Sequence, residues 1–109
     1  MREIIITRDA EESFDEILRY IMIKSGATLA GKIYDRIVTK IHLLSSVSFR
    51  GKVSEELKSI GITDIYELIE APWKIYYRLK QKQVIILLVL DSRRNLEEVL
   101  IDKIINKKD

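Results

Sequence analysis

The chain has 109 residues, of which 47% are hydrophobic and 33% charged, with four glycines, one proline and no cysteine. This balance predicts a single domain over residues 1–109 and excludes a disordered or collagen-like chain. Without cysteine there are no disulfides, thiolate metal sites or cysteine nucleophiles, which fits a reducing compartment, so we expect a cytoplasmic protein. No apolar run is long enough for a transmembrane helix and no signal-peptide core follows Met1, so we expect no membrane association.

The first half of the chain predicts one strand and two helices. Glu3–Thr7 is short, β-branched and bounded by charge, which is typical of an opening strand. Asp9, with a glutamate three residues later, resembles a capping box and predicts a helix to about Lys24. Ser25-Gly26 breaks it, and a second helix follows from about Thr28, which completes a helical hairpin. Each helix has one apolar stripe: Phe14, Ile17, Leu18, Ile21 and Met22 in the first, and Leu29, Ile33, Ile37, Ile41 and Leu44 in the second.

The second half predicts a sheet. Ser45–Gly61 has no clean period and is expected to be a connecting loop, with a short helical turn at Ser54–Lys58. Three strands are predicted at Ile62–Ile69, Trp73–Leu79 and Val84–Leu90, and the short turns between them favour an antiparallel meander. The chain ends in a predicted helix that Asn95 and Glu98 cap, with an apolar face made of Leu96, Val99, Leu100 and Ile104.

These elements predict an α+β fold, with an N-terminal strand and a helical hairpin packed on one face of an antiparallel sheet. The C-terminal part of that fold is the three-strand meander followed by a short helix. Both faces of the Val84–Leu90 strand are apolar, so both need cover. The hairpin can cover one face. The last helix covers the other, or that face is a groove for a partner's helix or strand.

Strand parity and charge point to a candidate binding surface. In the second meander strand Trp73, Ile75, Tyr77 and Leu79 alternate with Lys74, Tyr76, Arg78 and Lys80, so one face is core and the other is basic and aromatic. The net charge is only +2, but Ala71 to Arg94 carries six basic residues and one acidic residue. We therefore take Lys74, Arg78, Arg93 and Arg94 as candidate target-binding residues. The alternative is that the two arginines pair with Asp91, Glu97 or Glu98 as surface salt bridges.

Other kinds of chemistry are poorly represented. One histidine and no cysteine leave no metal-ligand spacing, and the glycines are isolated from one another, so we expect no metal and no cofactor. His42 lies beside the apolar stripe of the second helix, where a packing or surface role is the more common one. No catalytic residue is assigned.

Two runs of residues carry a family resemblance. Ile65–Leu79 followed by Val84–Leu100 resembles the C-terminal half of the RelE/ParE toxin superfamily of type II toxin–antitoxin modules, closer to the ParE-like plasmid-stabilisation toxins. The family pattern is an Arg-Glu-Leu strand, a Tyr-Arg-Ile-x-Tyr-Arg strand and an apolar strand that ends in an Arg-Arg-acid-Leu-like turn. The residues that match are Glu67, Leu68, Ile75, Tyr77, Arg78, Arg93, Arg94 and Leu96, whereas Tyr66, Trp73, Lys74 and Asn95 depart from the pattern.

The resemblance implies a function and partners. It implies a compact α+β toxin that a cognate antitoxin silences by wrapping it with a C-terminal segment. RelE-like members cleave mRNA on the ribosome, whereas ParE-like members poison DNA gyrase. The ribonucleases usually place a tyrosine or histidine after the family arginine, where this chain has Val99 and Leu100.

We therefore expect a ParE-like toxin with an antitoxin partner and gyrase as its target, so that no chemistry of its own is required. A RelE-like ribonuclease acting on ribosome and mRNA, with Lys52 or Lys74 as base, is one alternative. A non-toxic binding module is the other.

Overall fold

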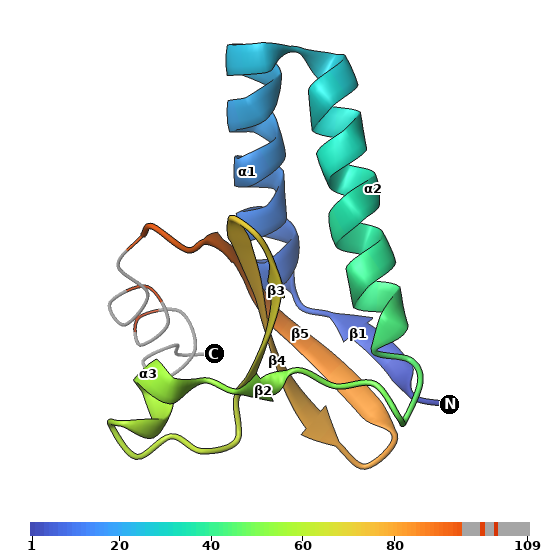
Figure 1. Cartoon of the computed structure of the whole chain (residues 1–109), viewed down its shortest axis with the longest axis vertical. Helices are drawn as coiled ribbons and strands as arrows, with labels where there is room; N and C mark the ends of the chain where they lie inside the picture. The colour runs from blue at the N-terminus through green and yellow to red at the C-terminus, as the bar shows by residue number, and fades with distance from the viewer. Residues whose placement is uncertain (95–98, 100–101, 103–109) are drawn as a thin grey trace.

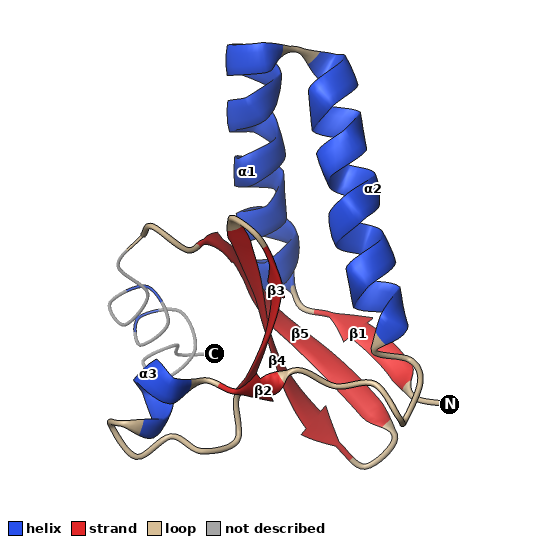
Figure 2. Ribbon diagram, viewed as in Figure 1, coloured by secondary structure: helices blue, strands red, loops and turns tan. Residues whose placement is uncertain are grey.

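The computed structural model describes residues 1–94, 99 and 102, and its arrangement of elements is shown in Figures 1 and 2. In chain order the elements are β1 (Glu3–Ile6), α1 (Arg8–Ser25), α2 (Ala27–Leu43), β2 (Lys52–Val53), α3 (Glu55–Lys58), β3 (Tyr66–Glu70), β4 (Trp73–Lys80) and β5 (Gln83–Asp91). The α+β prediction is confirmed. The predicted last helix from Asn95 lies outside the described residues except for Val99 and Asp102.

The sheet has the strand order β1-β5-β4-β3-β2. The predicted antiparallel meander is confirmed as β3, β4 and β5. β1 lies parallel to β5 at one edge of the sheet, with Glu3 opposite Gln83. A parallel pair needs a long connection between its strands, and the helical hairpin is part of that connection. At the other edge β2 pairs with β3 inside the segment predicted to be a loop, so that prediction was wrong for Lys52–Val53. β3 also starts later than expected, at Tyr66.

The first helix is capped by Thr7 and not by Asp9, which corrects the predicted start. The Thr7 hydroxyl accepts a hydrogen bond from the Ala10 backbone N–H at 3.1 Å and donates one to the Ile86 carbonyl at 2.7 Å. One side chain therefore satisfies a free helix donor and joins β1 and α1 to the adjacent strand.

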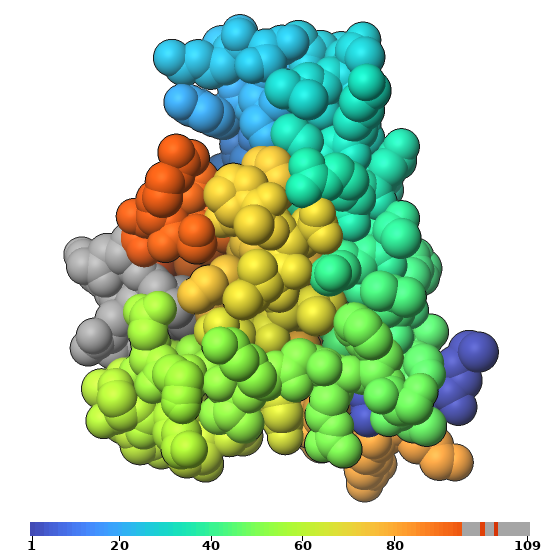
Figure 3. Space-filling view, in the orientation of Figure 1, coloured from blue at the N-terminus to red at the C-terminus, as the bar shows by residue number. Residues whose placement is uncertain are grey.

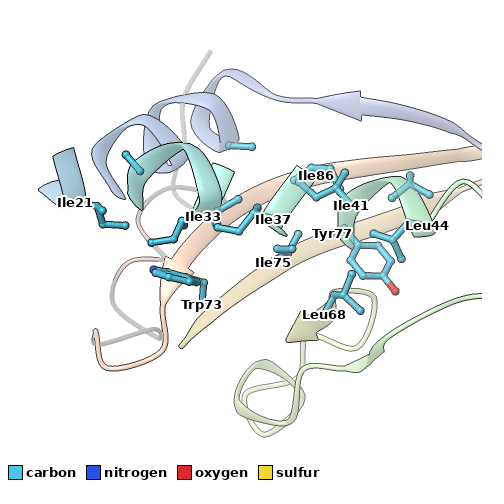
Figure 4. Packing of buried hydrophobic residues seen from close by; sticks show 14 residues of the cluster. Ile21, Ile33, Ile37, Ile41, Leu44, Leu68, Trp73, Ile75, Tyr77 and Ile86 are labelled. Atoms are coloured by element: carbon cyan, nitrogen blue, oxygen red, sulfur yellow. The ribbon is translucent and has the colours of Figure 1, made fainter. Parts of the chain in front are cut away.

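The helical hairpin covers one face of the sheet and continues past its edge (Figure 1). Ile37, Ile75, Tyr77 and Ile86 are fully buried between the two layers, as Figure 4 shows. Leu29 and Met22, which were placed on the apolar stripes, are 42% and 52% exposed. Both lie near the tip of the hairpin, where the sheet no longer lies beneath the helices.

A bulge in β5 changes which residues face each side. Tyr76 pairs with Leu88 and Tyr77 with Ile86, so Leu87 has no partner in β4. The alternation predicted for Val84–Leu90 therefore holds only as far as Ile86, and beyond the bulge Val89 faces the helices.

The second face of the sheet is covered by the chain itself. Leu57 of α3 and Ile65 pack there with Tyr76 and Leu88, and all four side chains are at most 1% exposed. Val99, from the predicted last helix, packs against this cluster. The expected intramolecular cover is confirmed for the described residues, and α3 supplies a part of it that had not been anticipated.

Candidate functional site

The four candidate cations lie in two separate places. Lys74 and Arg78 project from the face of β4 opposite to Trp73, away from the helical hairpin. Arg93 and Arg94 follow β5 beside α1, where they line a cleft that neither Lys74 nor Arg78 lines. The structure therefore does not bring the four cations together on one surface.

Lys74 is paired with a buried carboxylate. Its Nζ lies 3.6 Å from Oε2 of Glu67, whose side chain is only 5% exposed. Tyr76 lies opposite Glu67 in the neighbouring strand. Burial raises the pKa of Tyr76, and the charges of Glu67 and Glu56 raise it further, so its hydroxyl stays protonated. Lys74 and Glu67 therefore form a structural ion pair within the sheet.

The other three cations also have acidic partners. Arg78 Nε lies 3.0 Å from Asp64 Oδ2. Arg93 donates two side-chain hydrogen bonds to Asp91, from Nη2 to Oδ2 at 2.5 Å and from Nε to Oδ1 at 2.9 Å. The hydrogen bond from the Arg93 side chain is the largest cause that lowers the pKa of Asp91. Arg94 Nη1 lies 3.8 Å from Oε2 of Glu16.

We call Lys74, Arg78, Arg93 and Arg94 the paired cations. The predicted pairing of the arginines with Asp91 is confirmed for Arg93, whereas Arg94 pairs with Glu16. Glu97 and Glu98, the other partners considered, lie outside the described residues. Asp64 and Glu67 were missed as partners because the predicted strand pair had no fixed register, and Glu16 was missed because spacing does not show which distant segments meet.

A cleft of about 440 Å³ opens between the second half of α1 and the end of β5, and we call it the α1–β5 cleft. Its apolar part includes Ile17, Ile21 and Trp73, and its rim carries the two arginines with Glu16 and Tyr20. Its lining residues are Ser13, Glu16, Ile17, Tyr20, Ile21, Trp73, Val89, Leu90, Asp91, Arg93 and Arg94. The cleft thus joins a rim of two arginine–carboxylate pairs to an apolar floor.

A second cleft of about 390 Å³ lies on the other side of α1, beside β1. The rings of Phe14 and Tyr34 stack at 5.6 Å between the two helices and line it. His42 also lines it and is exposed, as expected for a helix-surface residue. Glu11 and Asp15 make its rim acidic.

The two lysines considered as a catalytic base lie in different surroundings. Cleavage of RNA needs a base, an acid and cations that are available to a phosphate. Lys74 is engaged by Glu67, and Lys52 is exposed on the edge strand β2. Tyr20 is not among the predicted site residues, yet it lines the α1–β5 cleft together with Arg93 and Arg94.

A family model settles the family of this chain. It describes the ParE toxin of the type II toxin–antitoxin system parDE and matches residues 4–96, from β1 through the whole sheet. The chain belongs to the ParE toxin family. Of the two branches that the sequence resembled, the ParE-like one is confirmed.

Individual relatives agree with this assignment. The chain is 29% identical over 96 residues to Toxin ParE3 of Caulobacter vibrioides, which covers 88% of this chain and 92% of the relative. It also resembles a solved structure described as the chromosomal ParDE TA system from P. aeruginosa, with 26% identity and a TM-score of 0.69. That match covers 82% of this chain and 94% of the solved one.

The ParE-family match covers all four paired cations, in β4 and in the turn after β5, and Lys74 among them departs from the arginine of the family pattern. Within residues 1–94, 99 and 102 no helix is long and apolar enough to cross a membrane.

Proposed function

We propose that this ParE-family toxin inhibits growth by binding and poisoning DNA gyrase in the cytoplasm, that a cognate antitoxin neutralises it, and that the pair acts as a plasmid-stabilisation module. The observation that carries the proposal is the ParE-family match over residues 4–96. A poison that acts by binding needs a shaped surface and no catalytic group, and the α1–β5 cleft offers such a surface.

The pairing of the cations supports binding over RNA cleavage. Each of the four is engaged by a carboxylate of the same chain, so an incoming phosphate has to displace an existing partner. For Lys74 that partner is buried, and exposing or orphaning Glu67 is costly. Arg93 and Arg94 are exposed and can exchange their partners at little cost.

The α1–β5 cleft also suits an antitoxin. Because both faces of β5 are covered within the chain, the antitoxin is not needed to complete the sheet. A small acidic protein that places apolar side chains against Ile17, Ile21 and Trp73 has its carboxylates close to Arg93 and Arg94. The neighbouring reading frame is the natural place to look for it.

Two assays run in parallel test the target. The purified chain is added to a gyrase supercoiling reaction and to a translation-coupled mRNA cleavage reaction. We expect loss of supercoiling with intact mRNA, and we expect an Arg93→Ala, Arg94→Ala variant to weaken that inhibition. Lys32→Ala, an exposed change on α2 outside both clefts, is the control for nonspecific charge effects.

The contrary outcomes identify the alternatives. Codon-specific cuts in ribosome-bound mRNA with unaffected supercoiling indicate the RelE-like ribonuclease, and then Tyr20→Phe tests the hydroxyl of the cleft. No effect in either assay, with harmless expression and no co-purifying small partner, indicates a non-toxic binding module.

A further inference from the structure

The end of the β4–β5 hairpin gathers cations from three separate segments of the chain. Lys80 and Lys82 flank the tip of the hairpin, Arg50 comes from the loop before β2, and Arg2 precedes β1. We call these four the hairpin-end cations. The N-terminus, the loop and the hairpin lie together at the lower edge of the molecule in Figure 1.

Hydrogen bonds hold the three segments in place. The Tyr77 hydroxyl of β4 accepts a hydrogen bond from the Gly51 backbone N–H at 2.7 Å, next to Arg50. The Arg2 guanidinium donates to two carbonyls of the same loop, those of Val47 at 3.3 Å and Phe49 at 3.4 Å. The Lys82 carbonyl accepts from the Glu3 N–H at 2.7 Å. These hydrogen bonds hold the backbones of the three segments that carry the cations next to one another.

The charges on this surface are available. Unlike the paired cations, Arg2, Arg50, Lys80 and Lys82 form no ion pair with a carboxylate of the described residues. Glu3 is the acidic residue at this end, and Gln83 donates a hydrogen bond to it at 3.2 Å. The charges of Arg2 and Arg50 both reach the Tyr77 hydroxyl, where they oppose the rise in its pKa that burial causes.

The shape of the surface favours a nucleic acid duplex. β4 continues past its last partner in β3 for three residues, Arg78–Lys80, so the hairpin reaches beyond that side of the sheet. Figure 3 shows its tip protruding below the loop. A two-stranded ribbon fits the major groove of B-DNA, whereas the major groove of A-form RNA is too narrow. In the segments that form this end, Met1 and Val47 are the large apolar residues that are exposed. Two such side chains offer little area for an apolar protein interface.

We propose that the hairpin-end cations bind the phosphate backbone of duplex DNA, with the tip of the β4–β5 hairpin in the major groove. The affinity comes from the release of counterions from the phosphates and carries no sequence preference. This goes beyond the proposed action on gyrase, and we expect the isolated chain to bind DNA with no gyrase present. A failure of the supercoiling assay and a failure of DNA binding are therefore separate results.

The experiment measures binding of the full chain, made by cell-free synthesis, to a short fluorescein-labelled DNA duplex by fluorescence anisotropy at several salt concentrations. A Lys80→Glu, Lys82→Glu variant is compared with an Arg19→Glu, Lys32→Glu variant. Both variants change the net charge equally, but the second changes exposed helix residues away from the hairpin. Circular dichroism establishes that each variant is folded.

We expect the hairpin variant to lose at least about tenfold in affinity at low salt, while the helix variant binds nearly as the unchanged chain does. The slope of log affinity against log salt is about −0.9 per phosphate contact, so removing two contacts reduces its magnitude by about two. Equal losses in the two variants, or no binding to DNA at low salt, overturn the proposal. Tighter binding to an RNA duplex, or to polyglutamate at the same charge concentration, assigns the surface to a different partner and also overturns it.

Discussion

The paired cations and the hairpin-end cations differ in what lies next to them. Lys74, Arg78, Arg93 and Arg94 follow one another closely in sequence, yet each meets a carboxylate, three of which come from distant parts of the chain. Arg2, Arg50, Lys80 and Lys82 are scattered over the sequence, yet the fold collects them at one end of the sheet.

This difference teaches that a run of basic residues is a poor guide to a basic surface. Pairing within the chain removes most of the field of a cation at longer range, whereas unpaired cations at one end of a molecule add their fields. The tertiary contacts decide which cations are available, and single changes to those contacts test the distinction.

The largest effect is expected from Gly51→Ala, which attacks the framework of the hairpin-end cations. A Cβ at position 51 would lie 2.0 Å from the Glu67 carbonyl oxygen, a backbone atom that cannot move without breaking the β2–β3 pair. We expect a loss of about 3 kcal/mol or more in the free energy of unfolding, measured by urea denaturation.

Gly31→Ala is the matched control for this change. Its Cβ meets nothing within 4 Å on α2, so alanine should stabilise the helix by up to about 1 kcal/mol. A Gly51→Ala protein as stable as the unchanged chain would show that the loop does not approach β3 as closely as described.

A smaller effect is expected from Tyr77→Phe, which removes the acceptor of the Gly51 N–H and leaves the packing of the ring unchanged. The loss should be about 1 kcal/mol, with faster hydrogen exchange at the Gly51 amide. Tyr66→Phe serves as the comparison, since this ring stacks on Tyr77 at 5.5 Å and its hydroxyl has no hydrogen bond among the described residues. Equal exchange rates in the two variants contradict the anchoring role of Tyr77.

Gln81→Gly should sharpen the comparison by changing the backbone of the hairpin tip without touching a charge. Gln81 has a φ of 55°, a conformation that costs a residue with a Cβ about 1 kcal/mol. Glycine also adds entropy to the unfolded chain, which offsets part of this gain. We therefore expect the free energy of unfolding, measured by thermal denaturation, to rise by about 0.5 kcal/mol. Gln81→Ala keeps the unfavourable φ and should show no gain.

The smallest effect concerns a paired cation. Arg93→Ala should let the pKa of Asp91 return toward its ordinary value of 3.8, because the Arg93 side chain is the main cause of its lowering. In the unchanged protein, the Asp91–Arg93 pair contributes to the free energy of unfolding above pH 3.8, and this contribution disappears as the pH falls through the lowered pKa of Asp91. NMR titration of the Asp91 carboxyl carbon measures the change, and an unshifted titration contradicts the role of the pair. Arg19→Ala should leave that titration as it is.

Much of the fold was readable from periodicity. The two helices, the meander and the division of β4 into Trp73, Ile75 and Tyr77 against Lys74 and Arg78 follow from spacing alone, and the burial of the first three bears this out. The bulge at Leu87 was not readable, since every residue from Val84 to Leu90 is apolar and any alternation fits such a run. The exposure of Leu29 depends on where the sheet ends beneath the hairpin, which is a tertiary property.

The candidate site was predicted less well than the fold. The family resemblance gave the toxin class, and the comparison with the ParE family model confirms it. Glu67 and Asp64 lie in the predicted strand next to that of Lys74 and Arg78, but the sequence did not fix the register that pairs them, whereas Glu16, 78 positions from Arg94, is too far away for spacing to carry information. The same limit hid the approach of the N-terminal segment to the hairpin, where the Glu3 N–H donates to the Lys82 carbonyl.

The parallel pairing of β1 with β5 has a consequence for how the chain acquires its structure. Glu3 and Gln83 are register partners although 80 residues separate them, so the first strand has no neighbour until almost the whole sheet has been synthesised. The Thr7 hydroxyl likewise waits for the Ile86 carbonyl. Long loops must close before these contacts form, which makes them late events in folding. A nascent or truncated chain that ends before Gln83 therefore lacks β5, the strand against which β1 and the helical hairpin pack, so the folded surface of this protein exists only after β5 has been synthesised.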